Sequence, residues 1–361
     1  MKDLCLPIHQ NGELCYNIIY SSDPNALQNE LKQTRLAERK ALIVTDSHVG
    51  PLYAKAIQDV IPGDPLIYTL PTGEENKTLD EIRHLLTFLV EHHYDRKSYL
   101  VALGGGVVGD MTGFASAIYM RGIDFIQIPT TLLAQADSSI GGKTGVDFDG
   151  YKNMVGAFKM PRLVIANVEF LKTLDERQYS SGFAEIMKSA LIRDVAFYEW
   201  LLEHHESILK KDPDVLFEMI YRSDKIKRDV VEKDPYEKGE RMLLNFGHTL
   251  GHAIEKYSRF TMTHGECVAL GCVAASYLSW QKGYLSKESY EKIRSGFPLF
   301  GLSNTIPSVD EKTILQLTKS DKKAVNGKVK FVLLHEIGNA FIEPSVSDEE
   351  ILSAVRVLVQ G

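Results

Sequence analysis

Short runs of apolar and β-branched residues alternate with helical patterns in the first half of the chain. The runs at 40–46, 65–71, 98–106 and 124–132 have the length and composition of strands. Between two of them, 78–93 repeats its apolar residues at helical spacing. Strands that alternate with helices are typical of a mostly parallel sheet covered by helices, so the pattern predicts an α/β domain here.

The second half of the chain has mainly helical apolar spacing. The stretches 183–211, 215–234 and 266–283 predict long helices, whereas 328–338 is more strand-like. The change from one pattern to the other marks a domain boundary, and a cleft between domains is a common place for a ligand. The predicted domains are 1–175 and 176–361.

The composition is that of a globular protein with a mildly acidic balance. Its 361 residues are enough for about two domains, and the net charge is −7. This balance argues against nucleic-acid binding but leaves room for a local basic pocket. The four cysteines form no C-x-x-C pair, which favours a reducing compartment. With no secretory signal and no apolar run of about 18 residues, we expect a cytoplasmic protein without a membrane span.

A glycine-rich turn follows the third predicted strand. Gly104, Gly106 and Gly109 fit the pattern G-x-G-x-x-G, in which backbone N–H groups at a helix start approach a pyrophosphate. A turn without any ligand fits the glycines equally well. Three nearby polar residues could complete a dinucleotide site, although each could also be a solvated charge: Asp46, Glu74 and Lys77.

A second glycine-rich stretch lies at 135–158. Gly142 and Gly145 flank Lys143, whose compact positive charge suits a phosphate or a carboxylate. Lys152 and Asn153 follow, and Asp137 precedes them. A flexible loop with solvated lysines remains an alternative.

Three histidines of the second half stand among small and polar residues. His248 and His252 are four apart and would share one helical face, the spacing with which two imidazoles can hold one metal ion. Glu185 and Lys188 are three apart on another predicted helix, and His264 begins the next one. Spacing alone leaves a metal site and an ordinary core equally open. Nearby basic residues suit an anionic substrate or a charged helix face: Lys227, Arg228 and Arg241.

Taken together, these stretches resemble the 3-dehydroquinate synthases of the sugar-phosphate cyclase superfamily. The resemblance covers about residues 40–340 and rests on several motifs in the family's order: "LGGGVVGDMTGFAS", "IGGKTGV", "KNMVGAF", "FAEIMK", "LNFGHTLGHAIE" and "HGE". It implies an α/β, Rossmann-like NAD-binding domain in 1–175 and an all-α, mainly helical metal- and substrate-binding domain in 176–361. It also implies an active site between the domains and a homodimer.

The implied activity is that of a carbon–oxygen lyase of the shikimate pathway. Such an enzyme converts 3-deoxy-D-arabino-heptulosonate 7-phosphate, a small anionic sugar-acid phosphate, to 3-dehydroquinate and phosphate. The steps are transient oxidation by NAD, phosphate elimination, reduction and aldol cyclisation. The implied cofactors are NAD and Zn²⁺ or Co²⁺.

The resemblance also assigns roles to individual residues. The implied metal ligands are Glu185, His248 and His264, so that His252 becomes an active-site group instead of a ligand. The other implied catalytic residues are Lys227, Asp137, Lys188 and Arg241, and all of these except Asp137 also match substrate-binding positions of the family. The implied substrate-binding residues are Lys143, Lys152, Asn153, Asn245 and Arg121, the last reaching a neighbouring subunit's site. The implied NAD contacts are Asp46, Glu74, Lys77, Gly105, Gly106, Asp110, Thr130 and Thr131. The lysine that completes the phosphate site stays open among Lys322, Lys323, Lys328 and Lys330.

Two positions depart from the family's usual residues, and three other functions compete with this one. Asp147 stands where asparagine is common, and Ser189 where an aromatic residue is frequent; neither carries chemistry in this interpretation. The rivals are a cyclase acting on another sugar phosphate, a metal-dependent polyol dehydrogenase and a catalytically inactive binding protein. Arg241 favours a 3-dehydroquinate synthase over these rivals, because its guanidinium suits a substrate carboxylate that the other sugar phosphates lack.

Overall fold

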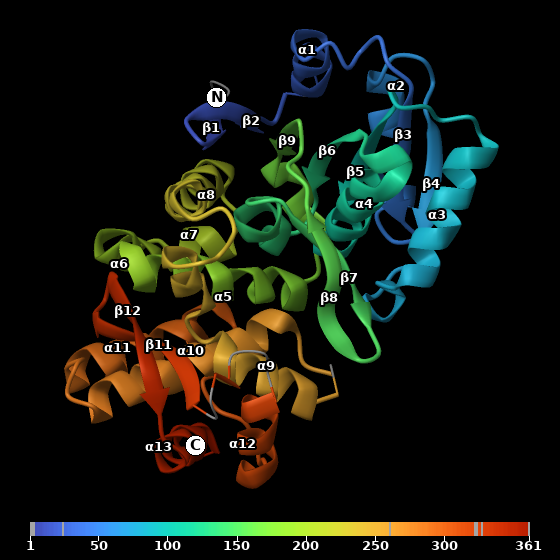
Figure 1. Ribbon diagram of the computed structural model, residues 1–361. Helices are drawn as coiled ribbons and strands as arrows, with labels where there is room; N and C mark the ends of the chain where they lie inside the picture. Colours follow the sequence, from blue (N-terminus) through green and yellow to red (C-terminus); the bar gives the residue numbers. More distant parts are fainter. Residues whose placement is uncertain (1–3, 24, 260, 321–323, 326–327, 360–361) are drawn as a thin grey trace. The chain divides into compact units, whose positions relative to one another are not determined.

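The computed structural model describes residues 4–23, 25–259, 261–320, 324–325 and 328–359. The chain divides into two compact units, Met1–Leu174 and Asp175–Gly361, and each is described by itself (Figure 1). No helix within the described residues is long and apolar enough to cross a membrane.

The N-terminal unit is built on a seven-stranded sheet in the order β1-β2-β9-β6-β5-β3-β4, in which β1 is antiparallel to β2 and the other neighbours are parallel. Four of the strands were predicted and are confirmed. The other three were missed. The strands are β1 (Leu4–Gln10), β2 (Glu13–Tyr20), β3 (Ala41–Asp46), β4 (Leu66–Leu70), β5 (Tyr99–Gly104), β6 (Asp124–Pro129) and β9 (Leu163–Ala166).

Both faces of this sheet are covered, which explains the uninterrupted apolar runs of its central strands. In β3, Ile43 belongs to one apolar cluster and Leu42 and Val44 to the other, as the alternation of side chains along a strand requires. The helices of this unit are α1 (Ala26–Gln33), α2 (Lys55–Val60), α3 (Leu79–Glu91) and α4 (Gly106–Ile118). Leu31 of helix α1 packs in the first cluster, and Ile82 of helix α3 packs in the second.

The second glycine-rich stretch forms a two-stranded antiparallel sheet rather than a loop. Strand β7 (Lys143–Phe148) pairs with β8 (Tyr151–Phe158). Asp149 and Gly150 make the turn with φ of 49° and 77°, values that aspartate tolerates and glycine adopts freely. Gly145 and Gly156 face each other, and a Cβ on Gly156 would lie 2.2 Å from the Thr144 carbonyl oxygen. Glycine is therefore needed for this close pairing.

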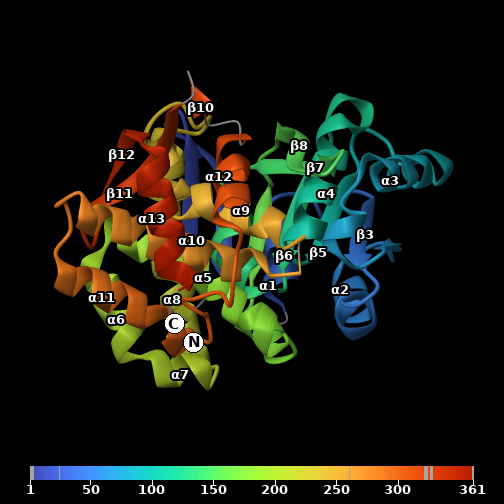
Figure 2. The ribbon, with the colours of Figure 1, turned by 90° about the horizontal axis from the view of Figure 1, so that it is seen from below.

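The C-terminal unit is mainly helical, and α10 runs through its core. Figure 2 shows α10 among α5, α9 and α13, with which it is in contact. All its residues from Cys267 to Ser276 are buried, apolar ones such as Val268 and small ones such as Ala274 alike, as expected of a helix segment without a polar face. The helices are α5 (Glu176–Arg193), α6 (Val195–Glu203), α7 (His205–Leu209), α8 (Pro213–Lys233), α9 (His248–Tyr257), α10 (His264–Gln281), α11 (Lys287–Gly296), α12 (Glu311–Ser320) and α13 (Asp348–Val359).

Two expectations for this unit need correction. The stretch 183–211 is not one helix, because Asp194 leaves helical geometry and its side chain accepts the Phe197 N–H as the cap of α6. The unit is also not all-α. The strand-like 328–338 is confirmed as β11 (Lys328–Glu336), which pairs with β10 (Ala324–Val325) and β12 (Asn339–Val346). Four consecutive residues of β11, from Phe331 to Leu334, are buried, so apolar side chains on both faces of this strand are covered, and the small sheet contacts α5, α10 and α12.

Candidate functional site

Three helices of the C-terminal unit bring Glu185, His248 and His264 together. Glu185 lies within α5 and is almost fully buried, while each histidine is the first residue of its helix. The start of α10 is fixed by a capping box in which Thr263 and Glu266 exchange hydrogen bonds. Before α9, Gly247 has a φ of 78°, and a Cβ there would lie 2.5 Å from the Cys272 sulfur.

The ligand atoms of these three residues converge. His248 Nε2 lies 3.3 Å and His264 Nε2 3.0 Å from Glu185 Oε1. One ligand atom of each lies within 4.8 Å of the others. His248 Nδ1 donates to the Phe246 carbonyl at 3.1 Å, which fixes the tautomer with a lone pair on Nε2. Two imidazoles and one carboxylate, aimed at a common point, are a donor set that Zn²⁺ or a similar divalent cation fits.

The charges around Glu185 keep it ionised. Burial raises the pKa of Glu185. The opposing effects of Lys188, which forms a buried ion pair with Glu185, and of His248 are larger, so the pKa lies well below its usual value. Burial lowers the pKa of His248 to about 4. Burial also opposes the charged form of His264, yet the carboxylates of Glu185 and Glu255 raise its pKa to about 9.

His252 lies beside this cluster rather than in it. Its ring centroid is 5.2 Å from that of His248 and 6.2 Å from that of His264. It belongs instead to a second group with Glu255 and His264. The i,i+4 pair is therefore not the set that converges on Glu185. Sequence reasoning missed Glu255, although it closes the quoted histidine motif.

The basic residues predicted for substrate binding are strongly buried in this unit. Lys227 is 7% and Arg241 2% exposed. Arg241 donates to the Pro235 carbonyl at 2.5 Å, and Asn245 Nδ2 donates to Glu237 Oε1 at 2.6 Å. The segment 234–240 thus contacts two predicted substrate residues, and Glu237 is a further acid that sequence reasoning missed.

In the N-terminal unit, the turn from β5 to α4 has open N–H groups. Helix α4 begins after Gly105, and no described side chain caps it. A Cβ on Gly105 would lie 3.0 Å from Thr131 Cγ2, and one on Gly106 would lie 3.2 Å from Ser138 Oγ. Thr130 Oγ1 is buried and has no hydrogen-bond partner among the described residues. An uncapped helix start beside an unpaired hydroxyl fits a dinucleotide phosphate.

Lys77 joins predicted cofactor residues to predicted substrate residues. Its ammonium lies 2.6 Å from Asp110 Oδ2 and 2.7 Å from Asn153 Oδ1. Glu74 Oε1 lies 3.8 Å from Lys77 and 3.6 Å from Lys152. Burial lowers the pKa of Lys77, but the carboxylates of Asp110 and Glu74 outweigh it and raise the pKa above its ordinary value.

The remaining predicted residues are more exposed to solvent. Asp46 ends β3 and accepts the N–H groups of His48 and Val49 at 2.8 Å. Asp137 is half-buried in the short turn Ala134–Ser138, and Lys143 and Arg121 are exposed. Of the four late lysines, Lys330 is an exposed residue of β11, the side chain of Lys328 is not described, and Lys322 and Lys323 lie outside the described residues.

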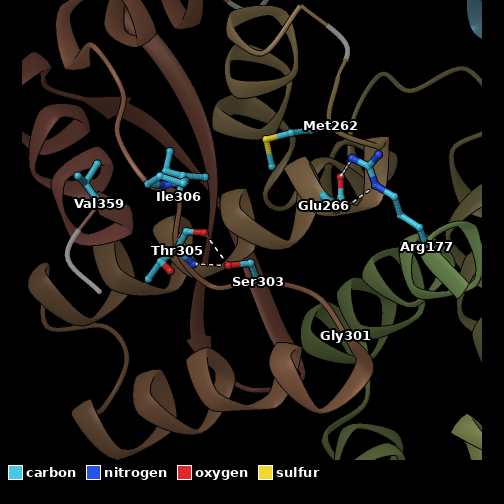
Figure 3. Close-up of a pocket in the computed structure, with 9 residues that line it drawn as sticks. Arg177, Met262, Glu266, Gly301, Ser303, Thr305, Ile306 and Val359 are labelled. Atoms are coloured by element: carbon cyan, nitrogen blue, oxygen red, sulfur yellow. Dashed lines mark hydrogen bonds and ion pairs between the residues drawn. The ribbon is translucent and has the colours of Figure 1, made fainter.

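The C-terminal unit has a pocket of about 660 Å³, whose lining residues are drawn in Figure 3. At its wall, Arg177 and Glu266 form an ion pair of 2.8 Å, while Met262, Ile306 and Val359 supply apolar surface. All nine described lining residues lie outside the predicted set, so no role in substrate or cofactor binding is assigned to this pocket.

Two family models match adjoining parts of the chain. The model described as 3-dehydroquinate synthase N-terminal matches residues 67–181, and the model described as 3-dehydroquinate synthase C-terminal matches residues 182–324. Together they span most of the chain, including all the residues of the converging Glu185 cluster.

Curated relatives and a solved structure are also similar. A 3-dehydroquinate synthase from Halorhodospira halophila is 43% identical over 340 residues, 94% of this chain and 95% of its own length. One from Acidithiobacillus ferrooxidans is 40% identical over 364 residues, 100% and 99% of the two chains. The structure of a 2-epi-5-epi-valiolone synthase from Streptomyces hygroscopicus, with NAD⁺ and Zn²⁺ bound, is 25% identical with a TM-score of 0.88. That match covers 98% of this chain and 99% of the other.

Proposed function

The chain belongs to the 3-dehydroquinate synthase family, and we propose that its buried clusters carry out the reaction of that family. The reaction converts 3-deoxy-D-arabino-heptulosonate 7-phosphate to 3-dehydroquinate and phosphate. The main support for placing the reaction at these residues is that His248 Nε2 and His264 Nε2 both lie close to Glu185 Oε1. The relatives at 40% identity or more favour this activity over that of another cyclase.

A divalent cation, zinc or cobalt, is proposed to bind Glu185, His248 and His264. When bound, it supplies a Lewis acid that polarises substrate oxygens. Lys188 holds Glu185 in its ionised form through their ion pair, and the Phe246 carbonyl holds His248 in the tautomer that leaves Nε2 free to bind. The similar valiolone synthase, which was solved with Zn²⁺, supports the choice of metal.

NAD is proposed to bind the N-terminal unit, where it supplies a reversible hydride acceptor. Gly105 and Gly106 would let the backbone come close to the pyrophosphate. The N–H groups at the start of α4 and the positive end of the helix dipole would stabilise its negative charge. Thr130 offers its unpaired hydroxyl. The other proposed contacts are Asp46, Glu74, Lys77, Asp110 and Thr131.

The remaining residues are proposed to bind the anionic substrate and to move its protons. Positive side chains in a buried setting fix phosphate and carboxylate groups and hold the reacting atoms in place. His252 is proposed to move a proton at its ring nitrogen, and Lys227 and Asp137 to hold substrate hydroxyls. The proposed binding residues are Lys143, Lys152, Asn153, Lys188, Arg241, Asn245 and Arg121.

We also propose a cytoplasmic homodimer in which Arg121 reaches the second subunit's site. Met120 and Arg121 have positive φ values of 48° and 71°, a strained geometry that is often kept for function. Met120 is also an exposed apolar residue, as is the nearby Ile118. Light scattering of the wild type and of Met120→Lys tests the dimer; a monomeric wild type would contradict it.

Phosphate release from the heptulosonate phosphate is the direct test of the function. The expected result is release that requires both a divalent cation and NAD⁺ and proceeds without net accumulation of NADH. Net NADH formation would indicate a polyol dehydrogenase. Release from other sugar phosphates, with none from the heptulosonate phosphate, would indicate another cyclase. No turnover of any of these substrates would favour a binding protein.

A further inference from the structure

The two ring nitrogens of His264 face two different carboxylates. Nε2 lies 3.0 Å from Glu185 Oε1, within the converging cluster, and Nδ1 lies 3.8 Å from Glu255 Oε1. Glu255 comes from α9 and is 3% exposed, so water does little to solvate its charge. A buried carboxylate is costly unless a partner compensates it, and His264 is such a partner.

The other histidine of the cluster is held in a parallel way. His248 turns Nε2 toward Glu185 and donates Nδ1–H to the Phe246 carbonyl. Each imidazole therefore has its Nε2 toward Glu185 and an oxygen near its Nδ1, at 3.1 Å for His248 and at 3.8 Å for His264. For His248 the acceptor is a neutral carbonyl, whereas for His264 it is a carboxylate, which makes the imidazole a stronger electron donor.

We infer that Glu255 is a positioning residue for the metal centre: it accepts the Nδ1 proton of His264 and so keeps Nε2 as a lone-pair donor to the cation. This inference rests on the proposed function, because it assumes that the Glu185 cluster holds a metal ion. Glu255 itself does not touch the ion. It acts through the tautomer and the orientation of one ligand.

A second arrangement of the same residues is the main alternative. His252, Glu255 and His264 also place one ligand atom each within 4.8 Å of one another. In that arrangement Glu255 would be a ligand and His264 would bind through Nδ1. The Glu185 arrangement is favoured because Nε2 of both histidines lies within 3.3 Å of a single oxygen of Glu185, whereas Glu255 lies 3.8 Å from His264.

The test is the metal affinity of Glu255→Gln, measured by competition between Co²⁺ and a chelator. Glutamine keeps the size of the side chain but removes its charge, and its amide can donate to Nδ1 and reverse the tautomer. We expect the affinity to fall about 10- to 100-fold, the usual effect of losing such a partner, together with a changed cobalt absorption spectrum. Glu255→Asp keeps the charge and should recover part of the loss.

Glu343→Gln is the matched control, since Glu343 is also a buried glutamate of this unit, bonded to Tyr284 and Ser345. It should leave the affinity and the spectrum unchanged. If Glu255→Gln lowers the melting temperature as Glu343→Gln does but binds Co²⁺ like the wild type, Glu255 is merely structural and the inference is overturned. Should Glu255→Gln fail to fold, Glu255→Ala takes its place, because it also removes the carboxylate behind Nδ1, and wild-type affinity and spectrum in that variant would overturn the inference.

Three further outcomes separate this inference from the proposed function. If His252→Ala loses as much Co²⁺ affinity as His264→Ala, Glu255 belongs to the ligand set and the inference is again overturned. If the wild type binds neither Co²⁺ nor Zn²⁺, the proposed metal centre itself fails. If the wild type binds and turns over while Glu255→Gln keeps full affinity, only the inference about Glu255 fails.

Discussion

The two units each bury a cluster of charges, but the clusters are organised differently. In the N-terminal unit a cation, Lys77, is surrounded by acceptors on Asp110 and Asn153 at 2.6–2.7 Å. In the C-terminal unit an anion, Glu185, faces two imidazole nitrogens that can each present a lone pair. Each cluster contains a buried lysine, since Lys188 pairs with Glu185 as Lys77 pairs with Asp110. Only the second adds two imidazole nitrogens that converge on one carboxylate oxygen, an arrangement that a bound cation stabilises. Buried charge alone therefore does not indicate a metal site, whereas imidazole and carboxylate atoms that converge on one point form a candidate one.

The largest expected effect would break the C-terminal cluster. Glu185→Ala removes a proposed ligand together with the carboxylate that pairs with the buried Lys188. We expect Co²⁺ affinity to fall by more than about 100-fold, beyond the effect of losing a residue behind a ligand, and phosphate release to be lost. Chelator competition and a phosphate assay measure the two. Retention of metal by this variant would mean that the ion binds elsewhere.

His252→Ala sharpens the boundary of the same cluster. His252 shares α9 with His248, yet only His248 approaches Glu185. If His252 moves protons, turnover should fall about 10²- to 10⁴-fold while Co²⁺ affinity stays close to that of the wild type. The measurements are kcat and chelator competition. Full turnover in His252→Ala would remove its proposed role.

Lys77→Met would break the N-terminal cluster. The variant removes the cation that lies 2.6 Å from Asp110, whereas Glu74 keeps its ion pair with Lys152. We expect the free energy of unfolding to fall by about 2–4 kcal/mol, at the lower side of the range for a fully buried pair, because Asp110 is 20% exposed. Urea unfolding measures this, and Co²⁺ affinity should not change. An unchanged free energy of unfolding would show that the cluster adds no stability.

The same substitution predicts a pH dependence. The pKa of Lys77 is raised by Asp110 and Glu74 above its ordinary value of 10.5. Its contribution to stability is then fully present below pH 10.5 and is lost as the pH rises through the raised value. The difference in stability between wild type and Lys77→Met should therefore be constant at neutral pH and shrink only in strongly alkaline solution. A difference that already shrinks between pH 6 and 8 would contradict it.

The smallest effect is expected at the pocket of Figure 3. Arg177 and Glu266 form an ion pair there, but their side chains are 56% and 24% exposed. Exposed pairs contribute about 0–1 kcal/mol, so Arg177→Ala should change the free energy of unfolding by no more than this. Co²⁺ affinity should stay the same, although Glu266 caps the helix that His264 begins. A loss of affinity would show that the start of α10 depends on this pair.

Much of the fold could be predicted from local patterns, because the central strands are buried on both faces and read as continuous apolar runs. The hairpin of β1 and β2 was missed, although Asn11 and Gly12, with φ of 54° and 82°, form a turn of the kind that such a dipeptide favours. The break at Asp194 was also missed, because apolar spacing continues across it and only the cap interrupts the helix.

The candidate site was harder to predict because its residues come from different elements. Helical spacing pairs His248 with His252, but the ligand atoms nearest Glu185 belong to His248 and His264 on two separate helices. Family motifs supplied what spacing could not. Glu255 and Glu237 stayed hidden because an acid's partner across helices or along an irregular segment leaves no periodic signal.

Gly247 shows how a position can be indispensable without any chemistry of its own. Its φ of 78° and the 2.5 Å that would separate an added Cβ from the Cys272 sulfur leave room for glycine alone. In a library that samples all twenty amino acids at every site, position 247 should tolerate substitution as poorly as the neighbouring His248, a proposed metal ligand. Fitness data on their own would then suggest that Gly247 is a catalytic residue, although it only sets the conformation of the backbone.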